Sequence, residues 1–202
     1  MSVTATTSDL ASLSFEEEQS PISVIISTIK KSVDPQDLIG DNKYAEPLKN
    51  YVTGLDDYRN VIYVEAEIEG NCLDHGSDPE KISCTLATHY GLPADSVLQL
   101  IGKKLGGHGK FSNLFPVNPN ILADWKSDED VVYKHVKKEN CSASLIYGIK
   151  FDDEEEPRRP SDFYYHFQFF ENGKSVGKAI ERHIKNICIP REKFVVNPAD
   201  FL

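Results

Sequence analysis

The basic side chains near the end of the chain are the first residues whose spacing could serve a chemical purpose. Lys178, Arg182 and Lys185 recur at intervals of four and three residues, which would place them on one side of a helix. Such a stripe could contact the phosphates of a nucleic acid. Helices also commonly carry this pattern as a solvated polar face, so both interpretations stay open.

The spacing of the cysteines gives little indication of a chemical site. They are scattered along the chain, without the close pairing that is typical of zinc sites. In a reducing compartment, we expect small buried apolar side chains rather than disulfides or metal ligands. They are Cys72, Cys84, Cys141 and Cys188.

Hydrophobic periodicity predicts the elements in the first half of the chain. Apolar residues from Ile22 to Val33 follow the spacing of one helical face, after a proline that suits a helix start. We predict a further short helix near residues 45–52. Residues 61–68 are rich in β-branched side chains and predict a strand that Gly70 ends.

Three further segments are predicted in the second half. Ser127 is a good N-cap for a helix over 128–139, with acidic residues at its start and lysines at its end. Two strands follow, over 142–151 and 162–170, and the second alternates aromatic with polar residues. The apolar residues Val176, Ile180, Ile184 and Ile187 predict a last helix, which would carry the basic stripe.

The central segment carries a family resemblance. The sequence LIGKKLGGHGKFSNLFPVNPNI, from Leu100 to Ile121, resembles the signature of the DNA/RNA non-specific endonucleases, which often reads GHLI, three residues, LGG, then NL(V/F)P and a run of Asn. The helix, strands and Arg159-Pro160 follow in the family's order, and Arg59 to Glu69 resembles its first core strand. The resemblance covers about residues 59–175. It implies a ββα-metal active site.

The resemblance also implies a particular chemistry. In the family, the His of a DxGH sequence takes a proton from the attacking water, an Asn after the NL(V/F)P run holds Mg²⁺, and a Glu further along positions the metal's waters. Hydrolysis of a phosphodiester needs such a base and such a cation, because water at neutral pH is a poor nucleophile and the leaving group develops negative charge.

Carried over by position, the resemblance puts unsuitable residues at both key places. Gln99 falls at the base position, and an amide has no useful basicity. Leu122 falls at the metal position, although Mg²⁺ requires oxygen ligands. If this register holds, Gln99 and Leu122 should converge on one small cleft beside the loop 106–109, with Asp130 near its floor.

Weaker candidates could substitute for the lost groups. His108 could act as a base, although a histidine in the exposed turn of a Gly-rich loop is the favoured interpretation. Asn118, Asn120 and Asp130 could contact a metal, and Asp130 could equally stabilise the start of a helix. The candidates for contacting nucleic acid are Lys103, Lys104, Lys110, Arg159, Lys178, Arg182 and Lys185.

Composition limits the partners and the compartment. The formal net charge of −10 opposes loose binding of a polyanion, although the second half is locally basic on either side of the acidic run at 152–156. We find no secretory signal and no apolar run long enough to span a membrane, so we expect an intracellular protein, in the cytoplasm or nucleus.

Together these observations predict an α+β fold: a small, mostly antiparallel sheet with packed helices and an embedded ββα-metal element. We expect an acidic, Ser/Thr-rich disordered tail over residues 1–20 and a single nuclease-like domain over 21–202. The favoured function is that of an inactive nuclease-like protein that binds a protein or a nucleic acid, with no cofactor. The alternatives are an active Mg²⁺- or Mn²⁺-dependent endonuclease with relocated catalytic residues, or a delivered effector or toxin.

Overall fold

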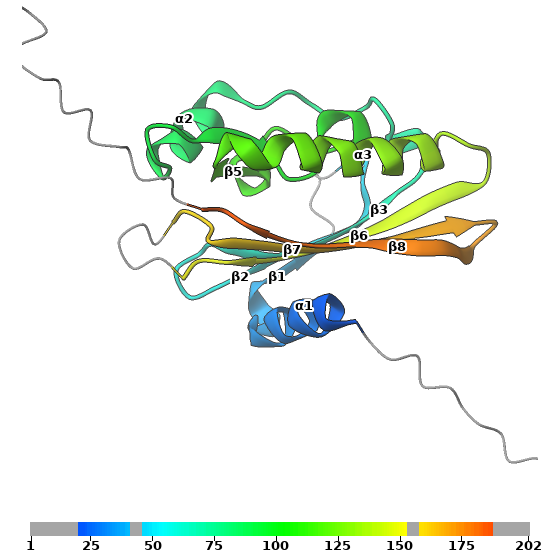
Figure 1. Ribbon diagram of the computed structural model, residues 1–202, viewed down its shortest axis with the longest axis horizontal. Coiled ribbons are helices and arrows are strands. Elements are labelled where there is room, and N and C mark those ends of the chain that lie inside the picture. The colour runs from blue at the N-terminus through cyan, green and yellow to red at the C-terminus, as the bar shows by residue number, and fades with distance from the viewer. Residues whose placement is uncertain (1–19, 41–45, 153–157, 188–202) are drawn as a thin grey trace, which may run out of the picture.

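The computed structural model describes residues 20–40, 46–152 and 158–187 as three layers (Figure 1). A six-stranded sheet forms the middle layer. Helix α1 covers one face, and helices α2 and α3 with the hairpin β4–β5 cover the other. The helices are α1 (Pro21–Ser32), α2 (Lys81–His89) and α3 (Leu122–Val136), and the strands are β1 (Leu38–Gly40), β2 (Lys49–Leu55), β3 (Val61–Ile68), β4 (Ser96–Gln99), β5 (Leu114–Val117), β6 (Cys141–Lys150), β7 (Asp162–Glu171) and β8 (Lys174–Lys185).

The sheet is antiparallel throughout, in the order β1-β2-β3-β6-β7-β8. Strands β6 and β7 pair without a break from Cys141–Glu171 to Lys150–Asp162. The short strands β4 and β5 form a second, two-stranded sheet. The predicted α+β class with a mostly antiparallel sheet is confirmed.

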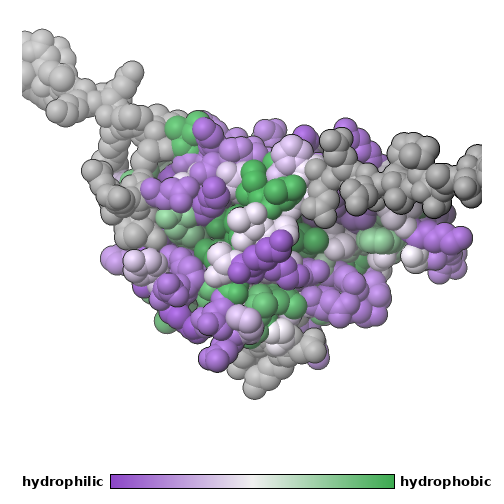
Figure 2. Space-filling view, turned by 90° about the horizontal axis from the view of Figure 1, so that it is seen from below, coloured by the Kyte–Doolittle hydropathy of each residue, from purple (hydrophilic) through white to green (hydrophobic). Residues whose placement is uncertain are grey.

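Two hydrophobic cores join the layers. The larger one lies between the sheet and the α3 layer, and its largest side chain, Trp125, is surrounded by the aromatic rings of β6 and β7. The smaller one lies under α1, where Ile26, Ile29 and Val33 pack on Tyr63 and Tyr164. Figure 2 shows the α1 side of the molecule, where hydrophobic patches alternate with hydrophilic ones.

Several predicted elements are confirmed. The first helix begins at Pro21, where the hydroxyl of Ser20 accepts the Ser23 N–H at 3.1 Å. The strands predicted at 61–68, 142–151 and 162–170 correspond to β3, β6 and β7. The helix predicted from residue 128 begins earlier, at Leu122, so Ser127 lies inside α3 and is not its N-cap.

The last predicted helix is wrong, because residues 174–185 form the edge strand β8. Val176, Ile180 and Ile184 are spaced by four residues, and an even spacing also places residues on one face of a strand. Ile180 pairs with Phe167, and Ile184 with Phe163, so both pack on the larger core. The sheet provided the long-range partners that the local spacing could not reveal.

Two other expectations need correction. The helix predicted near residues 45–52 is not formed, because Lys49–Leu55 pairs with β3 as strand β2. Helix α2 lies in a segment to which the sequence assigned no element. The predicted tail at 1–20 falls, except for Ser20, outside the described residues. Among the described helices, none has the length and apolar character that crossing a bilayer requires.

Two core tyrosines differ in whether their buried hydroxyl group has a hydrogen-bond partner, so removing each hydroxyl should change the stability in opposite directions. Tyr147 Oη is buried and has no hydrogen-bond partner among the described residues, whereas Tyr165 Oη donates to Asp128 at 2.8 Å. A buried unsatisfied hydroxyl is costly, and a hydrogen bond to a carboxylate is favourable. We predict that Tyr147→Phe stabilises the protein by about 1 kcal/mol and that Tyr165→Phe destabilises it by about 2 kcal/mol. Urea denaturation measures both, and equal destabilisation by the two variants would contradict the assignment.

Candidate functional site

The hairpin β4–β5 and helix α3 follow one another as a ββα element on one side of the large sheet (Figure 1). Gln99, the last residue of β4, pairs with Leu114, the first of β5. The loop between them contains the Gly-rich segment, and α3 starts five residues after β5 ends. The candidate site was predicted inside this element.

Gln99 is held by the backbone around the Gly-rich loop. Its Nε2 donates to the Ser77 carbonyl at 3.1 Å and to the Gly107 carbonyl at 3.2 Å. Both amide hydrogens therefore tie β4 to the two loops beside it. At the position that the resemblance assigns to a proton acceptor, the side chain acts as a donor.

Gln99 and Leu122 differ in how they relate to the larger core. Leu98 and Leu100, on either side of Gln99, both belong to the larger core, so the strand directs Gln99 away from that core. Leu122 packs against the same core. The common cleft expected for Gln99 and Leu122 stays a prediction.

The Gly-rich loop is organised by a buried asparagine. Asn113 is 1% exposed, and its Nδ2 donates to the Ile101 carbonyl at 3.0 Å and to the His108 carbonyl at 2.8 Å. Its Oδ1 accepts the Ile101 N–H at 3.0 Å. Gly107 lies so close to Ile101 that a Cβ there would be 1.7 Å from the Ile101 carbonyl oxygen. The motif residues thus shape the loop itself.

His108 is buried, which corrects the expectation of an exposed turn histidine. It is 7% exposed, its Nε2 lies 3.1 Å from the hydroxyl of Tyr51, and the two rings meet edge-on. Burial, followed by the nearby charge of Lys110, lowers the pKa of His108. A histidine enclosed in this way is neutral at physiological pH and holds the loop against β2.

Helix α3 turns Glu129 inward, and not Asp130. Asp130 is exposed and pairs with Lys104. Glu129 is 5% exposed, and it accepts the Gly102 N–H at 2.6 Å. Burial raises its pKa to about 7, against the opposing effect of that hydrogen bond. The sequence shows three acidic residues in a row, and only the rotation of the docked helix decides that Asp128 and Glu129 are buried and Asp130 is exposed.

Asn118 and Asn120 border a small pocket with Asp124 and Lys185. The Oδ1 of Asn118 accepts the Asn120 N–H at 2.9 Å, and its Nδ2 donates to the Ile187 carbonyl at 3.0 Å. Within residues 20–40, 46–152 and 158–187, no group of three or more His, Cys, Asp or Glu side chains could hold a metal ion.

Most of the basic candidates form ion pairs inside the protein. Lys103 pairs with Asp78, Lys104 with Asp130, and Lys110 with Glu80. Lys178 and Lys185 are exposed on β8 and form no ion pair with any described residue. The expected stripe of three is therefore interrupted.

Arg182 and Arg159 have structural partners that the sequence did not indicate. Arg182 donates to Asp128 from Nε at 2.9 Å and from Nη2 at 3.2 Å, across the layers. Arg159 is 3% exposed and makes a two-pronged contact with Asp95, at 2.7 and 3.0 Å, and a bond to the Asn186 carbonyl at 2.7 Å. The buried pair of Arg159 with Asp95 and the half-exposed pair of Arg182 with buried Asp128 hold the hairpin layer and α3 on the sheet.

Comparison with solved structures found distant likenesses. A solved structure described as an extracellular nuclease has 10% identity and a TM-score of 0.44, over 73% of this chain and 92% of that one. One described as an extracellular endonuclease has 10% identity and a TM-score of 0.46, over 74% and 85%. No family model and no curated protein matches the chain. At this level, neither likeness identifies a function.

The buried carboxyl of Glu129 predicts a pH-dependent stability. Its folded-state pKa of about 7 lies above the ordinary value of 4.5, so the folded protein binds the proton more tightly. This group's contribution to stability is therefore full below pH 4.5 and is lost as the pH rises to about 7, by on the order of 3 kcal/mol. We predict that Glu129→Gln, which keeps an acceptor for Gly102, removes this loss.

The measurement is urea denaturation of both proteins from pH 4.5 to 8. Asp130→Asn is the matched control, because Asp130 is exposed and its pKa is lowered by Lys104, so it leaves the slope in this window unchanged. Parallel curves for wild type and Glu129→Gln would show that another group causes the pH dependence.

Proposed function

We propose that this chain is a nuclease-like protein that does not cleave phosphodiesters at its ββα element and acts by binding a protein or nucleic-acid partner. The observation that carries the proposal is the use of Gln99. Its amide donates two hydrogen bonds to backbone carbonyls at the position where the resemblance requires a base. An amide has no useful basicity, so this group cannot take a proton from the attacking water.

Leu122 supports the same proposal. At the position of the metal-binding Asn, its side chain packs against the larger core. A divalent cation there would lack an oxygen ligand and would face an apolar surface. The chain thus uses both positions for stability, as a scaffold released from catalysis would.

The internal ion pairs favour a protein over a nucleic acid as the partner. Nucleic-acid affinity comes mainly from cations that neutralise phosphates, and five of the seven basic candidates already face a carboxylate. The net charge of −10 adds a general repulsion. An intracellular location, in the cytoplasm or nucleus, belongs to this proposal, and the free thiols of Cys72, Cys84 and Cys141 suit a reducing compartment.

The second candidate function is an active Mg²⁺- or Mn²⁺-dependent endonuclease with relocated ligands. One observation favours it: Asn120 and Asp124 offer oxygen atoms to the same small pocket, beside the cation of Lys185. Hard divalent cations select such oxygen ligands. This candidate has a clear discriminating variant in Asp124→Asn.

We predict that the purified protein leaves plasmid DNA, single-stranded DNA and RNA uncut in Mg²⁺ or Mn²⁺. Gel assays over hours at micromolar protein provide the measurement. Cleavage that survives repeated chromatography, requires the metal and disappears in Asp124→Asn would establish the endonuclease and overturn the proposal. His108→Ala is not a suitable probe, because removing this buried ring would also disturb the loop.

We predict weak binding to generic duplex DNA at physiological salt, with a shallow dependence on salt concentration. Any binding should involve Lys178 and Lys185, the two basic candidates of β8 that form no ion pair within the described part of the chain. Lys178→Glu plus Lys185→Glu should abolish it in fluorescence anisotropy titrations. Lys103→Glu, which replaces an ion-paired lysine at a different surface, is the control, and an unchanged salt slope in the double variant would exclude β8 from the contact.

A further inference from the structure

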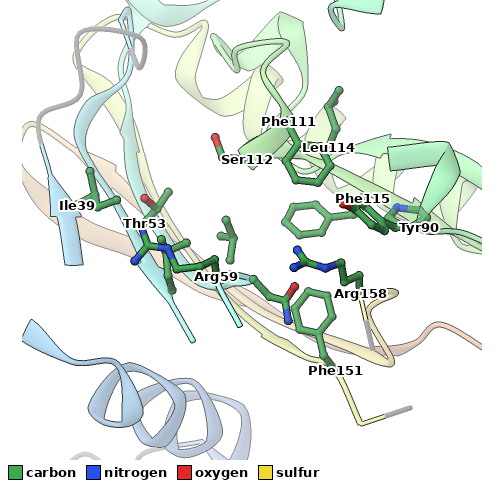
Figure 3. A pocket seen from close by; sticks show the side chains of 14 residues that line it. Ile39, Thr53, Arg59, Tyr90, Phe111, Ser112, Leu114, Phe115, Phe151 and Arg158 are labelled. Atoms are coloured by element: carbon green, nitrogen blue, oxygen red, sulfur yellow. The ribbon is translucent and has the colours of Figure 1, made fainter. Parts of the chain in front are cut away.

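A cavity of about 300 Å³ opens between the large sheet and the β4–β5 layer (Figure 3), and neither Gln99 nor Leu122 lines it. Strands β1, β2 and β3 form one wall, through Ile39, Thr53 and Val61. The turn after α2 and the start of β5 form the other wall. The cavity thus lies where two layers meet, a common place for a ligand site.

Several aromatic side chains line the cavity. Tyr90, Phe111, Phe115 and Phe151 line it, and the rings of Tyr90 and Phe111 lie 6.0 Å apart. Phe111 is 39% exposed, which is high for an apolar side chain of this size. An apolar ligand would remove these rings from water, and that burial is favourable in proportion to its area.

Two arginines border the cavity from opposite sides (Figure 3). Arg59 forms an ion pair with Asp37 at 2.5 Å, so its charge is already matched. Arg158 has no carboxylate partner among the described residues, and its guanidinium lies over the Tyr90 ring at 5.2 Å from the ring centre. Stacking on the ring orders the guanidinium at the edge of the apolar space.

We propose that this cavity binds a small aromatic carboxylate, with the aromatic body between the phenylalanine rings and the carboxylate on Arg158. A single available guanidinium matches one carboxylate, because its fork of N–H groups can donate to both oxygens. The hydroxyl of Ser112 lines the same space and can add a further bond. The volume suits one bicyclic body rather than an extended chain segment. This assignment is independent of the proposed loss of nuclease chemistry.

The experiment compares three probes on the full-length chain by titration calorimetry. They are 2-naphthylacetate, the uncharged 2-naphthylacetamide, and acetate. Naphthylacetate should bind with a Kd below about 1 mM, the amide about 10-fold more weakly, and acetate not measurably, because a charge-assisted pair adds roughly that factor to apolar burial. Equal binding of the amide and the acid would overturn the assignment of the carboxylate.

Variants then locate the contact. Arg158→Gln should weaken naphthylacetate about 10-fold and leave the amide unchanged, whereas the control Lys178→Gln, on β8, should change neither. Ser112→Trp should fill the cavity and weaken both naphthyl probes, and circular dichroism checks that each variant is folded. Unaltered naphthylacetate binding in folded Arg158→Gln or Ser112→Trp would place the ligand elsewhere. Tighter binding of 2-naphthyl phosphate than of naphthylacetate would assign a phosphate instead of a carboxylate. Either result overturns the proposal.

Discussion

The packing of Trp125 between the ββα element and the large sheet is the contact on which the rest of the structure depends. The side chain is 2% exposed, and its Nε1 donates to the Leu100 carbonyl at 3.2 Å. Its ring stacks on Tyr147 and meets Phe163 and Tyr165 edge-on, with centroids 5.0–5.9 Å apart. One residue of α3 thus fixes the loop after β4 and the distance of the helix from the sheet.

Once Trp125 is docked, the neighbouring charges must find partners in a region with little water. Asp128 accepts hydrogen bonds from Tyr165 and Arg182. The next residue, Glu129, accepts a hydrogen bond from the Gly102 N–H. Removing a charge from water is costly unless it is paired and hydrogen-bonded. These charged residues, which could have acted in catalysis or bound a phosphate, therefore stabilise the packing of one layer on the other.

The layers create two regions that differ in how much exposed surface they offer to a ligand. Around Gln99, Asn113 and His108, side-chain polar atoms form hydrogen bonds within the protein and hold the loop in place. At the other junction of the layers, aromatic rings and the guanidinium of Arg158 border an open cavity. Unused binding capacity in this protein is concentrated where apolar surface remains exposed to solvent.

The sequence by itself determined the α+β class, the first helix and the central strands, because their patterns of apolar residues are local and unambiguous. It could not separate a helix from a strand over 174–185, where a spacing of four residues fits one face of either. The pairing of Ile180 with Phe167 decided that segment. The same limit explains the missed strand β2, whose partner β3 is also supplied by the fold.

The candidate site shows the same division. The sequence located the ββα element and the unsuitable residues Gln99 and Leu122 within it. Only the tertiary structure decided that the Gln99 amide binds two backbone carbonyls, that Glu129 rather than Asp130 is buried, and that His108 is enclosed. Which side of a helix or strand a residue occupies depends on how that element is rotated when it docks. That rotation is set by distant partners such as Trp125 and the rings of β6 and β7, which no local pattern contains.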